Sequence, residues 1–241
     1  GNGKRLLERP FKEVLESGKP DFPFCLAWAN ESWKGLSHGL KNRETLIEQF
    51  YPGVDDYTNH FYEVLPAFLD KRYITIDNKP VFMIYKPLAS IEINIFINTW
   101  RNLAKEHGLP GIYFIGHCAN DDDNFHKYIE MDFDAINTLR IINFWVKKSY
   151  ISKLFTRIAK KILALPLIAT YDSAQKYFLN NNIDLHNNVF PSIISGWDHT
   201  PRSGKDGILF TKYTPRSFSK HVQSVIEINK SKKNNVIFLK S

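Results

Sequence analysis

The stretch Phe22-Pro23-Phe24-Cys25-Leu26-Ala27-Trp28-Ala29-Asn30-Glu31-Ser32-Trp33 is an apolar run that ends in a polar Asn-Glu pair between two tryptophans. Its apolar part, opened by Pro23, predicts a buried strand over 22–29. Barrel and open α/β enzymes place their chemistry just beyond the carboxyl ends of such strands. Glu31 is therefore a candidate catalytic residue, and a structural pairing of Glu31 with a basic neighbour is the alternative.

The two tryptophans beside Glu31 indicate a ligand with both an apolar face and hydroxyl groups. A sugar ring stacks on indole while its hydroxyls need hydrogen-bond acceptors. Aromatic residues make up 14% of the 241-residue chain, which suits a carbohydrate site and equally suits an aromatic core. Apolar residues at 43% are sufficient for a large core, and 24% charged residues are ordinary for a soluble protein.

Strand-like and helix-like runs alternate along the chain, which predicts an α/β fold with a parallel sheet. Further strands are expected over 80–85, 111–118, 133–137, 189–197 and 236–241, and helices over 6–17, 56–71, 91–107 and 215–230. Six strands would suit a doubly wound sheet, but no Gly-rich phosphate loop follows any of them. A barrel needs eight strands. Both ends look cut, so residues 1–241 are expected to form one barrel domain that is truncated at both ends and has about six of its eight strands.

Polar side chains gather just after the predicted strands. They are Asn30, Glu31 and Trp33, then Tyr85 and Lys86, then His117, Asn120 and Asp121, and finally Trp197, Asp198, His199, Thr200, Pro201 and Arg202. In a barrel these strand ends share one face, so Glu31 and Asp198 are expected to meet over one pocket. Two carboxylates are the minimum for acid/base work at a glycosidic bond. For Asp198, a local turn or an ion pair with Arg202 is the alternative.

Metal and nucleophile chemistry are weakly indicated. A divalent metal at Asp121 and Asp123 is conceivable, but acidic triplets are also ordinary solvated residues, so we expect no metal and no cofactor. The histidines show no metal-ligand spacing, and no Gly-x-Ser-x-Gly motif occurs. Cys25 and Cys118 lie in strand-like runs and are expected to be buried, which favours a reducing compartment.

The formal charge of +7 is concentrated, because no acidic residue occurs between Asp134 and Asp172. Within that window, 151–165 has apolar residues at helical spacing with basic residues largely opposite. The favoured interpretation is a helix packed on the domain with a solvated basic face, and peripheral contact with an anionic membrane is the alternative. No nucleic-acid motif is present, so no nucleic-acid partner is expected. No run approaches a membrane span and no secretory signal opens the chain, so we expect a cytoplasmic protein, with peripheral contact at the inner membrane as the alternative.

Four segments resemble a known family. Residues 24–33, with the sequence FCLAWANESW, resemble the WANExW motif of the WbsX-like glycosyltransferases, which belong to the glycoside hydrolase family 99-like superfamily. Residues 46–51 (LIEQFY), 72–80 (RYITIDNKP) and 196–202 (GWDHTPR) match further segments in order. The resemblance covers nearly the whole chain.

This resemblance implies a (β/α)₈ barrel that acts on sugars in the assembly of bacterial surface polysaccharides of the O-antigen or capsule type. Its partners would be a sugar donor and a glycan acceptor. Family members usually carry a Tyr- and Trp-rich strand upstream and a Trp-Asn-Glu-Trp segment downstream. Neither is found in this chain, which again predicts a truncated domain.

We therefore expect a glycosyltransferase-like domain with Glu31 and Asp198 as its catalytic carboxylates. Glu31 would act as acid/base or stabilise a developing oxocarbenium charge. The residues expected to contact the substrate are Trp28, Asn30, Trp33, Gln49, Tyr51, Tyr85, His117, Trp197, Thr200 and Arg202. Glycoside hydrolysis is the first alternative, and a non-catalytic carbohydrate-binding module is the second.

Overall fold

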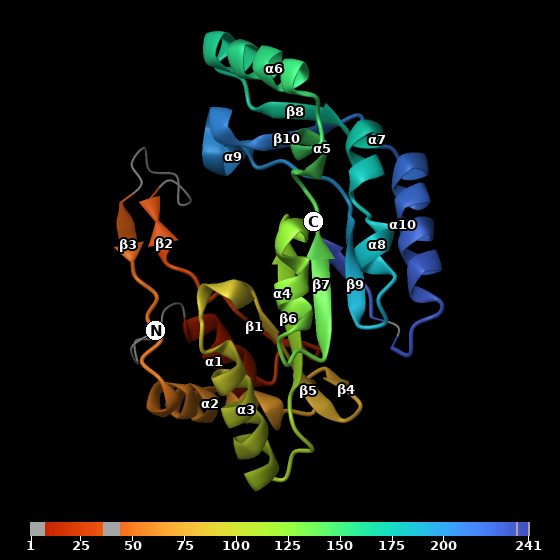
Figure 1. Cartoon of the computed structure of the whole chain (residues 1–241). Helices are drawn as coiled ribbons and strands as arrows, with labels where there is room; N and C mark the ends of the chain where they lie inside the picture. The colour runs from red at the N-terminus through yellow and green to blue at the C-terminus, as the bar shows by residue number, and fades with distance from the viewer. Residues whose placement is uncertain (1–7, 36–43, 235, 241) are drawn as a thin grey trace. The chain divides into compact units, whose positions relative to one another are not determined.

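A computed structural model describes residues 8–35, 44–234 and 236–240, with the side chains of 155 and 159–161 left out. The chain divides into two compact units (Figure 1). Unit 1 comprises residues 1–32, 47–117 and 126–136, and unit 2 comprises 33–46, 118–125 and 137–241.

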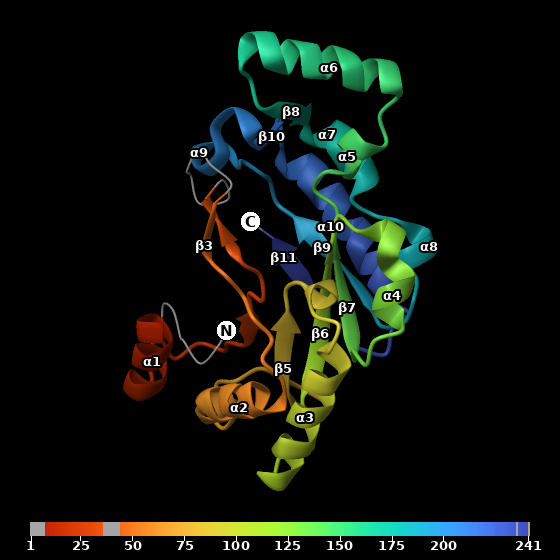
Figure 2. The same cartoon turned by 60° about the vertical axis from the view of Figure 1, so that its left-hand side comes forward.

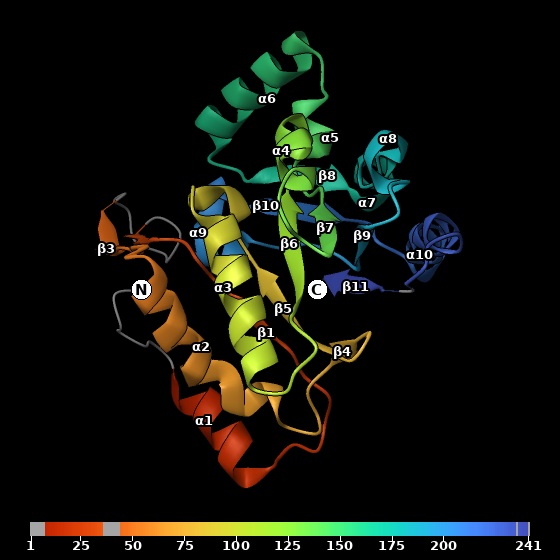
Figure 3. The ribbon, with the colours of Figure 1, turned by 60° about the horizontal axis from the view of Figure 1, so that its bottom comes forward.

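Unit 1 alternates helices with strands, as the sequence predicts. Its elements are α1 (Glu8–Ser17), β1 (Leu26–Trp28), α2 (Val54–Phe68), β4 (Thr75–Ile76), β5 (Lys79–Ile84), α3 (Ile93–Glu106), most of β6 (Tyr113–Ala119) and most of α4 (Phe125–Ile129). The strands pair in the order β1-β5-β6, and both pairings are parallel. The short β4 pairs antiparallel with β5. Helices α2 and α3 pack side by side in this unit (Figure 3).

Unit 2 also mixes short helices with strands. Its elements are β2 (Trp33–Lys34), most of β7 (Ala135–Leu139), α5 (Asn143–Val146), α6 (Tyr150–Leu163), β8 (Leu167–Thr170), α7 (Tyr171–Ala174), α8 (Asn181–Asp184), β9 (Val189–Ile194), α9 (Thr200–Ser203), β10 (Ile208–Thr211), α10 (Pro215–Asn229) and β11 (Phe238–Lys240), and β3 (Thr45–Ile47) is divided between the units. The strand order is β7-β9-β11, and β8 pairs with β10. The β9–β11 and β8–β10 pairings are parallel. Helices α8 and α10 lie beside β9 (Figure 1).

The predicted α/β class is confirmed, and all six predicted strands form as β1, β5, β6, β7, β9 and β11. The strands β2, β3, β4, β8 and β10 were not predicted, because with two to four residues each they are too short for a clear pattern. Closure into an eight-stranded barrel stays a prediction, as does the single-domain organisation.

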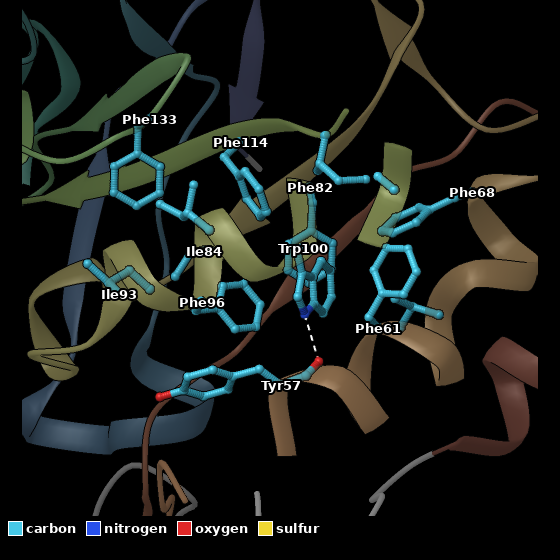
Figure 4. Packing of buried hydrophobic residues seen from close by; sticks show 14 of the residues in the cluster. Tyr57, Phe61, Phe68, Phe82, Ile84, Ile93, Phe96, Trp100, Phe114 and Phe133 are labelled. Carbon is cyan, nitrogen blue, oxygen red and sulfur yellow. Dashed lines mark hydrogen bonds between the residues drawn. The ribbon is translucent and has the colours of Figure 1, made fainter. Parts of the chain in front are cut away.

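The core of unit 1 is an aromatic cluster between the helices and the strands (Figure 4). Trp100 of α3 is fully buried at its centre, with ring centroids 4.5 Å from Phe96 and 4.7 Å from Phe82. Its indole Nε1 donates a hydrogen bond to the backbone oxygen of Tyr57 in α2, at 2.8 Å. Because a buried indole N–H needs a partner, this bond fixes how α3 packs on α2.

The strand β1 corrects one expectation from the sequence. Leu26 and Trp28 pack against the aromatic core, whereas Cys25 and Ala27 are exposed. Successive side chains of a strand point to opposite faces, so a three-residue strand with one covered face exposes every second residue. Cys118 is buried as predicted, but Cys25 is not.

We expect Trp100→Ala to lower the free energy of unfolding by about 3–5 kcal/mol, because it opens a large cavity and removes the indole donor to the Tyr57 carbonyl. Trp100→Phe keeps much of the volume and should cost less. Urea unfolding followed by circular dichroism measures both variants. A loss below about 1 kcal/mol for Trp100→Ala would show that α2 and α3 do not depend on this residue.

Candidate functional site

A polar arrangement in unit 1 is built around Asn30, which follows β1 and is fully buried. Its side-chain Oδ1 accepts from the backbone N–H of Lys86 at 2.7 Å, and its Nδ2 donates to the backbone oxygen of Lys86 at 2.8 Å. Lys86 follows β5, and the backbone N–H of Tyr85 donates to the Trp28 oxygen at 3.0 Å. Asn30 therefore fastens together the loops that leave two adjacent parallel strands.

Tyr51 completes this arrangement. Its hydroxyl donates to the backbone oxygen of Asn30 at 2.7 Å and accepts from the Asn30 Nδ2 at 3.1 Å. Burial raises the pKa of Tyr51, the hydrogen bond from Asn30 opposes the rise, and the negative charge of Glu31 adds to it. The phenol therefore stays protonated and able to donate across the neutral pH range. Tyr51, predicted to contact substrate, here supports the loop that carries Glu31.

Glu31 and Lys86 are the charged groups that this framework presents. The Lys86 Nζ lies 4.0 Å from Glu31 Oε2, and each side chain is close to half exposed, at 44% and 46%. An exposed pair at this distance contributes little to stability. The alternative raised by the sequence, a basic neighbour for Glu31, is thus present, yet both groups stay accessible to a ligand.

Aromatic rings border the charged pair. Tyr85 is 37% exposed and stacks on the buried His117 of β6, with ring centroids 5.4 Å apart and planes tilted by 20°. The Lys86 Nζ lies 5.2 Å from the Tyr85 ring centroid. Unit 1 therefore brings Glu31, Lys86, Tyr85 and His117 together at the ends of β1, β5 and β6. We call these four residues the Glu31 cluster.

The other predicted contact residues of unit 1 have mainly structural contacts. The Trp28 ring packs against Phe96 at 4.8 Å and His60 at 5.2 Å, so much of it belongs to the core. Gln49 turns its side chain to the backbone oxygen of Phe50, and its own backbone N–H donates to the Ser32 hydroxyl. Their predicted contact with substrate stays untested.

In unit 2, Asp198 is exposed and turned to its own loop. Its Oδ1 accepts from the backbone N–H of Thr200 at 2.8 Å and from the Thr200 hydroxyl at 2.6 Å. These hydrogen bonds hold the pKa of Asp198 below its ordinary value. The local-turn alternative is thus realised here, just before α9.

The remaining predicted residues of unit 2 are Trp33, Trp197 and Arg202. The Trp197 ring stacks with the His199 ring, with ring centroids 6.1 Å apart, and the Lys240 Nζ lies 5.8 Å from the Trp197 ring centroid. Trp33 lies half-buried in β2. Arg202 is exposed on α9. Because Glu31 and Asp198 belong to different units, their meeting over one pocket stays a prediction.

Sequence reasoning missed a buried ion-pair cluster in unit 2. Arg140, only 1% exposed, donates its Nε to Asp122 and its Nη1 to Asp184, each at 2.8 Å. Asn180 also donates to Asp122, at 3.0 Å. Arg140 is therefore buried and paired rather than solvated. Its position shortly after the predicted strand over 133–137 was the available signal.

The same cluster bears on the metal alternative at Asp121 and Asp123. The central residue of the triplet, Asp122, is held by Arg140, and Asp121 accepts from Asn124 at 2.8 Å. In the parts of the chain that are described, no three His, Cys, Asp or Glu side chains are placed to hold a metal ion. A metal at Asp121 and Asp123 stays an untested alternative.

The model of the family described as Glycosyltransferase WbsX matches residues 1–241, the whole chain. The chain belongs to the WbsX glycosyltransferase family. The resemblance read from its motifs is confirmed, and membership of the WbsX family supports a carbohydrate-active enzyme in general terms.

Two bacterial relatives of this WbsX family member carry the name "Uncharacterized protein WxcX". The protein from Xanthomonas campestris pv. campestris (strain B100) is 24% identical over 225 residues, which cover 90% of this chain and 30% of the relative. The protein from a second strain of that pathovar is 29% identical over 111 residues, covering 46% of this chain and 16% of the relative. The chain thus spans less than a third of the length of these relatives.

Among solved structures, a protein titled "Glycoside hydrolase-like protein" aligns with a TM-score of 0.48 and 13% identity, over 80% of this chain and 52% of that one. A likeness at this level carries no argument about the activity of the WbsX family member.

The Asn30 framework generates a prediction. Asn30→Ala leaves the Lys86 N–H without its acceptor and removes one of two donors to the Lys86 C=O, which still accepts from the Ala89 N–H. Hydrogen exchange at the Lys86 amide should therefore accelerate at least about tenfold, with a stability loss of about 1–3 kcal/mol. Exchange followed by NMR measures the effect. Asn98→Ala, at an exposed asparagine with one weak 3.4 Å bond to Asp132, is the matched control and should change neither quantity. Unchanged Lys86 protection in Asn30→Ala would contradict this role.

Proposed function

We propose that this chain is the sugar-handling part of a glycosyltransferase of bacterial surface polysaccharide biosynthesis, and that the Glu31 cluster acts on the sugar. The observation that carries the proposal is an accessible carboxylate–ammonium pair, Glu31 with Lys86 at 4.0 Å, on strand-end loops fixed by the buried Asn30. Family membership supports sugar transfer as the reaction class. The role in O-antigen or capsule assembly rests on the motif resemblance.

The residues of the cluster suit complementary tasks. Glu31 can accept a proton from an attacking hydroxyl or stabilise positive charge at an oxocarbenium-like centre. Lys86 offers three N–H donors to sugar hydroxyls or to the phosphate of an activated donor. Tyr85 presents a half-exposed ring on which the apolar face of a sugar can stack. Asp198, Thr200, Arg202 and Trp197 are proposed as further contacts on the basis of their motif.

Hydrolysis and simple binding are the outcomes to be distinguished. A transferase needs an activated donor and releases its leaving group only with acceptor in place. A hydrolase releases sugar from a glycan with water alone. A binding module holds glycan with no turnover, and Glu31→Gln would leave that binding intact.

We expect Glu31→Gln to lower turnover by two or more orders of magnitude, the usual contribution of a general acid or base. The assay measures nucleoside diphosphate released from a panel of sugar nucleotides with and without glycan acceptors, and reducing ends released from glycan alone. Glu227→Gln is the matched control, because it also removes a carboxylate from an exposed lysine pair, on α10. Near-wild-type turnover of Glu31→Gln would exclude the catalytic role.

A further inference from the structure

The helix α6 carries an exposed apolar face that its unit leaves uncovered. Ile151, Leu154, Ile158 and Ile162 recur at intervals of three and four residues and are 67%, 46%, 46% and 74% exposed. Residues at this spacing share one side of a helix. The sequence favoured a helix packed on the domain by its apolar side, but these four side chains are open to solvent. Figure 2 shows α6 at the outer edge of unit 2.

The helix is a well-defined element with its own boundaries. The Ser149 side chain accepts from the backbone N–H of Ser152 at its start, and Ala164 ends it in the left-handed conformation, at φ 51°. Its 14 residues extend about 21 Å. That length is too short to span a bilayer, and none of the described helices is both long and apolar enough to cross one. An apolar face on such a helix suits the membrane interface.

The charges around this face specify the kind of surface it fits. No acidic residue occurs between Asp134 and Asp172, while Lys147 and Lys148 precede the helix and Lys153, Arg157, Lys160 and Lys161 lie within it. Lys153 and Arg157 form no ion pair with the described residues. Positive charge on the polar side of a helix whose other side is aliphatic complements anionic lipid headgroups above an acyl layer.

Aromatic side chains add to this complementarity at the start of the helix. Tyr150 is 76% exposed, and the Lys148 ammonium lies 5.7 Å from the Trp145 ring centroid just before it. Tyrosine and tryptophan favour the headgroup region, where an apolar ring and a polar atom are both accommodated. We propose that α6 docks this chain on an anionic membrane surface, with Ile151, Leu154, Ile158 and Ile162 facing the acyl chains and Lys153 and Arg157 among the headgroups.

Sedimentation with vesicles tests the docking. Vesicles of phosphatidylcholine and phosphatidylglycerol at about 3:1 should bring down the wild-type chain, and pure phosphatidylcholine should retain much less. Ile158→Asp should lower the partition coefficient at least about tenfold, because it places in the apolar face a polar, negatively charged group that anionic lipids repel. Ile226→Asp is the matched control on α10, where Ile226 is 40% exposed, and should bind as the wild type does.

A second experiment tests the electrostatic contribution to vesicle binding. The double variant Lys153→Gln/Arg157→Gln should lose about tenfold in binding to the anionic vesicles and show a shallower salt dependence. Circular dichroism confirms that each variant stays folded. The proposal is overturned if the wild type remains in solution with anionic vesicles at low salt. It is also overturned if light scattering shows a wild-type dimer that Ile158→Asp dissociates, since the face would then bind a second copy of the chain.

Discussion

The pair of hydrogen bonds between the Asn30 side chain and the Lys86 backbone is the constraint on which the candidate site depends. It joins the loops after β1 and β5 at the point where the parallel pairing of these strands ends. A buried amide is suited to this task because it satisfies one backbone donor and one acceptor without burying a charge. The side chains of Lys86 and of Glu31, the residue after Asn30, can then stay exposed while the backbone that carries them is held in place.

This arrangement divides the WANExW segment between structure and chemistry. Trp28 packs on the core, Asn30 is fully buried, and Glu31 alone projects as an accessible charged group. A site needs a rigid support beneath its reactive groups, and here residues 28–31 supply both the support and the carboxylate. The adjacent Tyr85–His117 stack extends the same support to β6.

The six main strands could be predicted because each is an apolar run bounded by turn residues, and Glu31 could be singled out because it follows such a run. The role of Lys86 could not, since its backbone makes the bonds and no side-chain pattern reports which backbone groups pair. The burial of Arg140 could not be predicted, because its partners Asp122 and Asp184 are distant in the sequence. Cys25 was misjudged because the strand that forms has only three residues, with one face covered.

The Glu31 cluster is proposed as the place where this chain holds a sugar. The most direct measurement is an NMR titration of the backbone amides with sugar nucleotides and glycan acceptors. We expect saturable shifts centred on Glu31, Lys86 and His117 that are lost in Asn30→Ala. Saturable binding that leaves these three amides unmoved, or no binding by any member of the panel, would contradict this proposal.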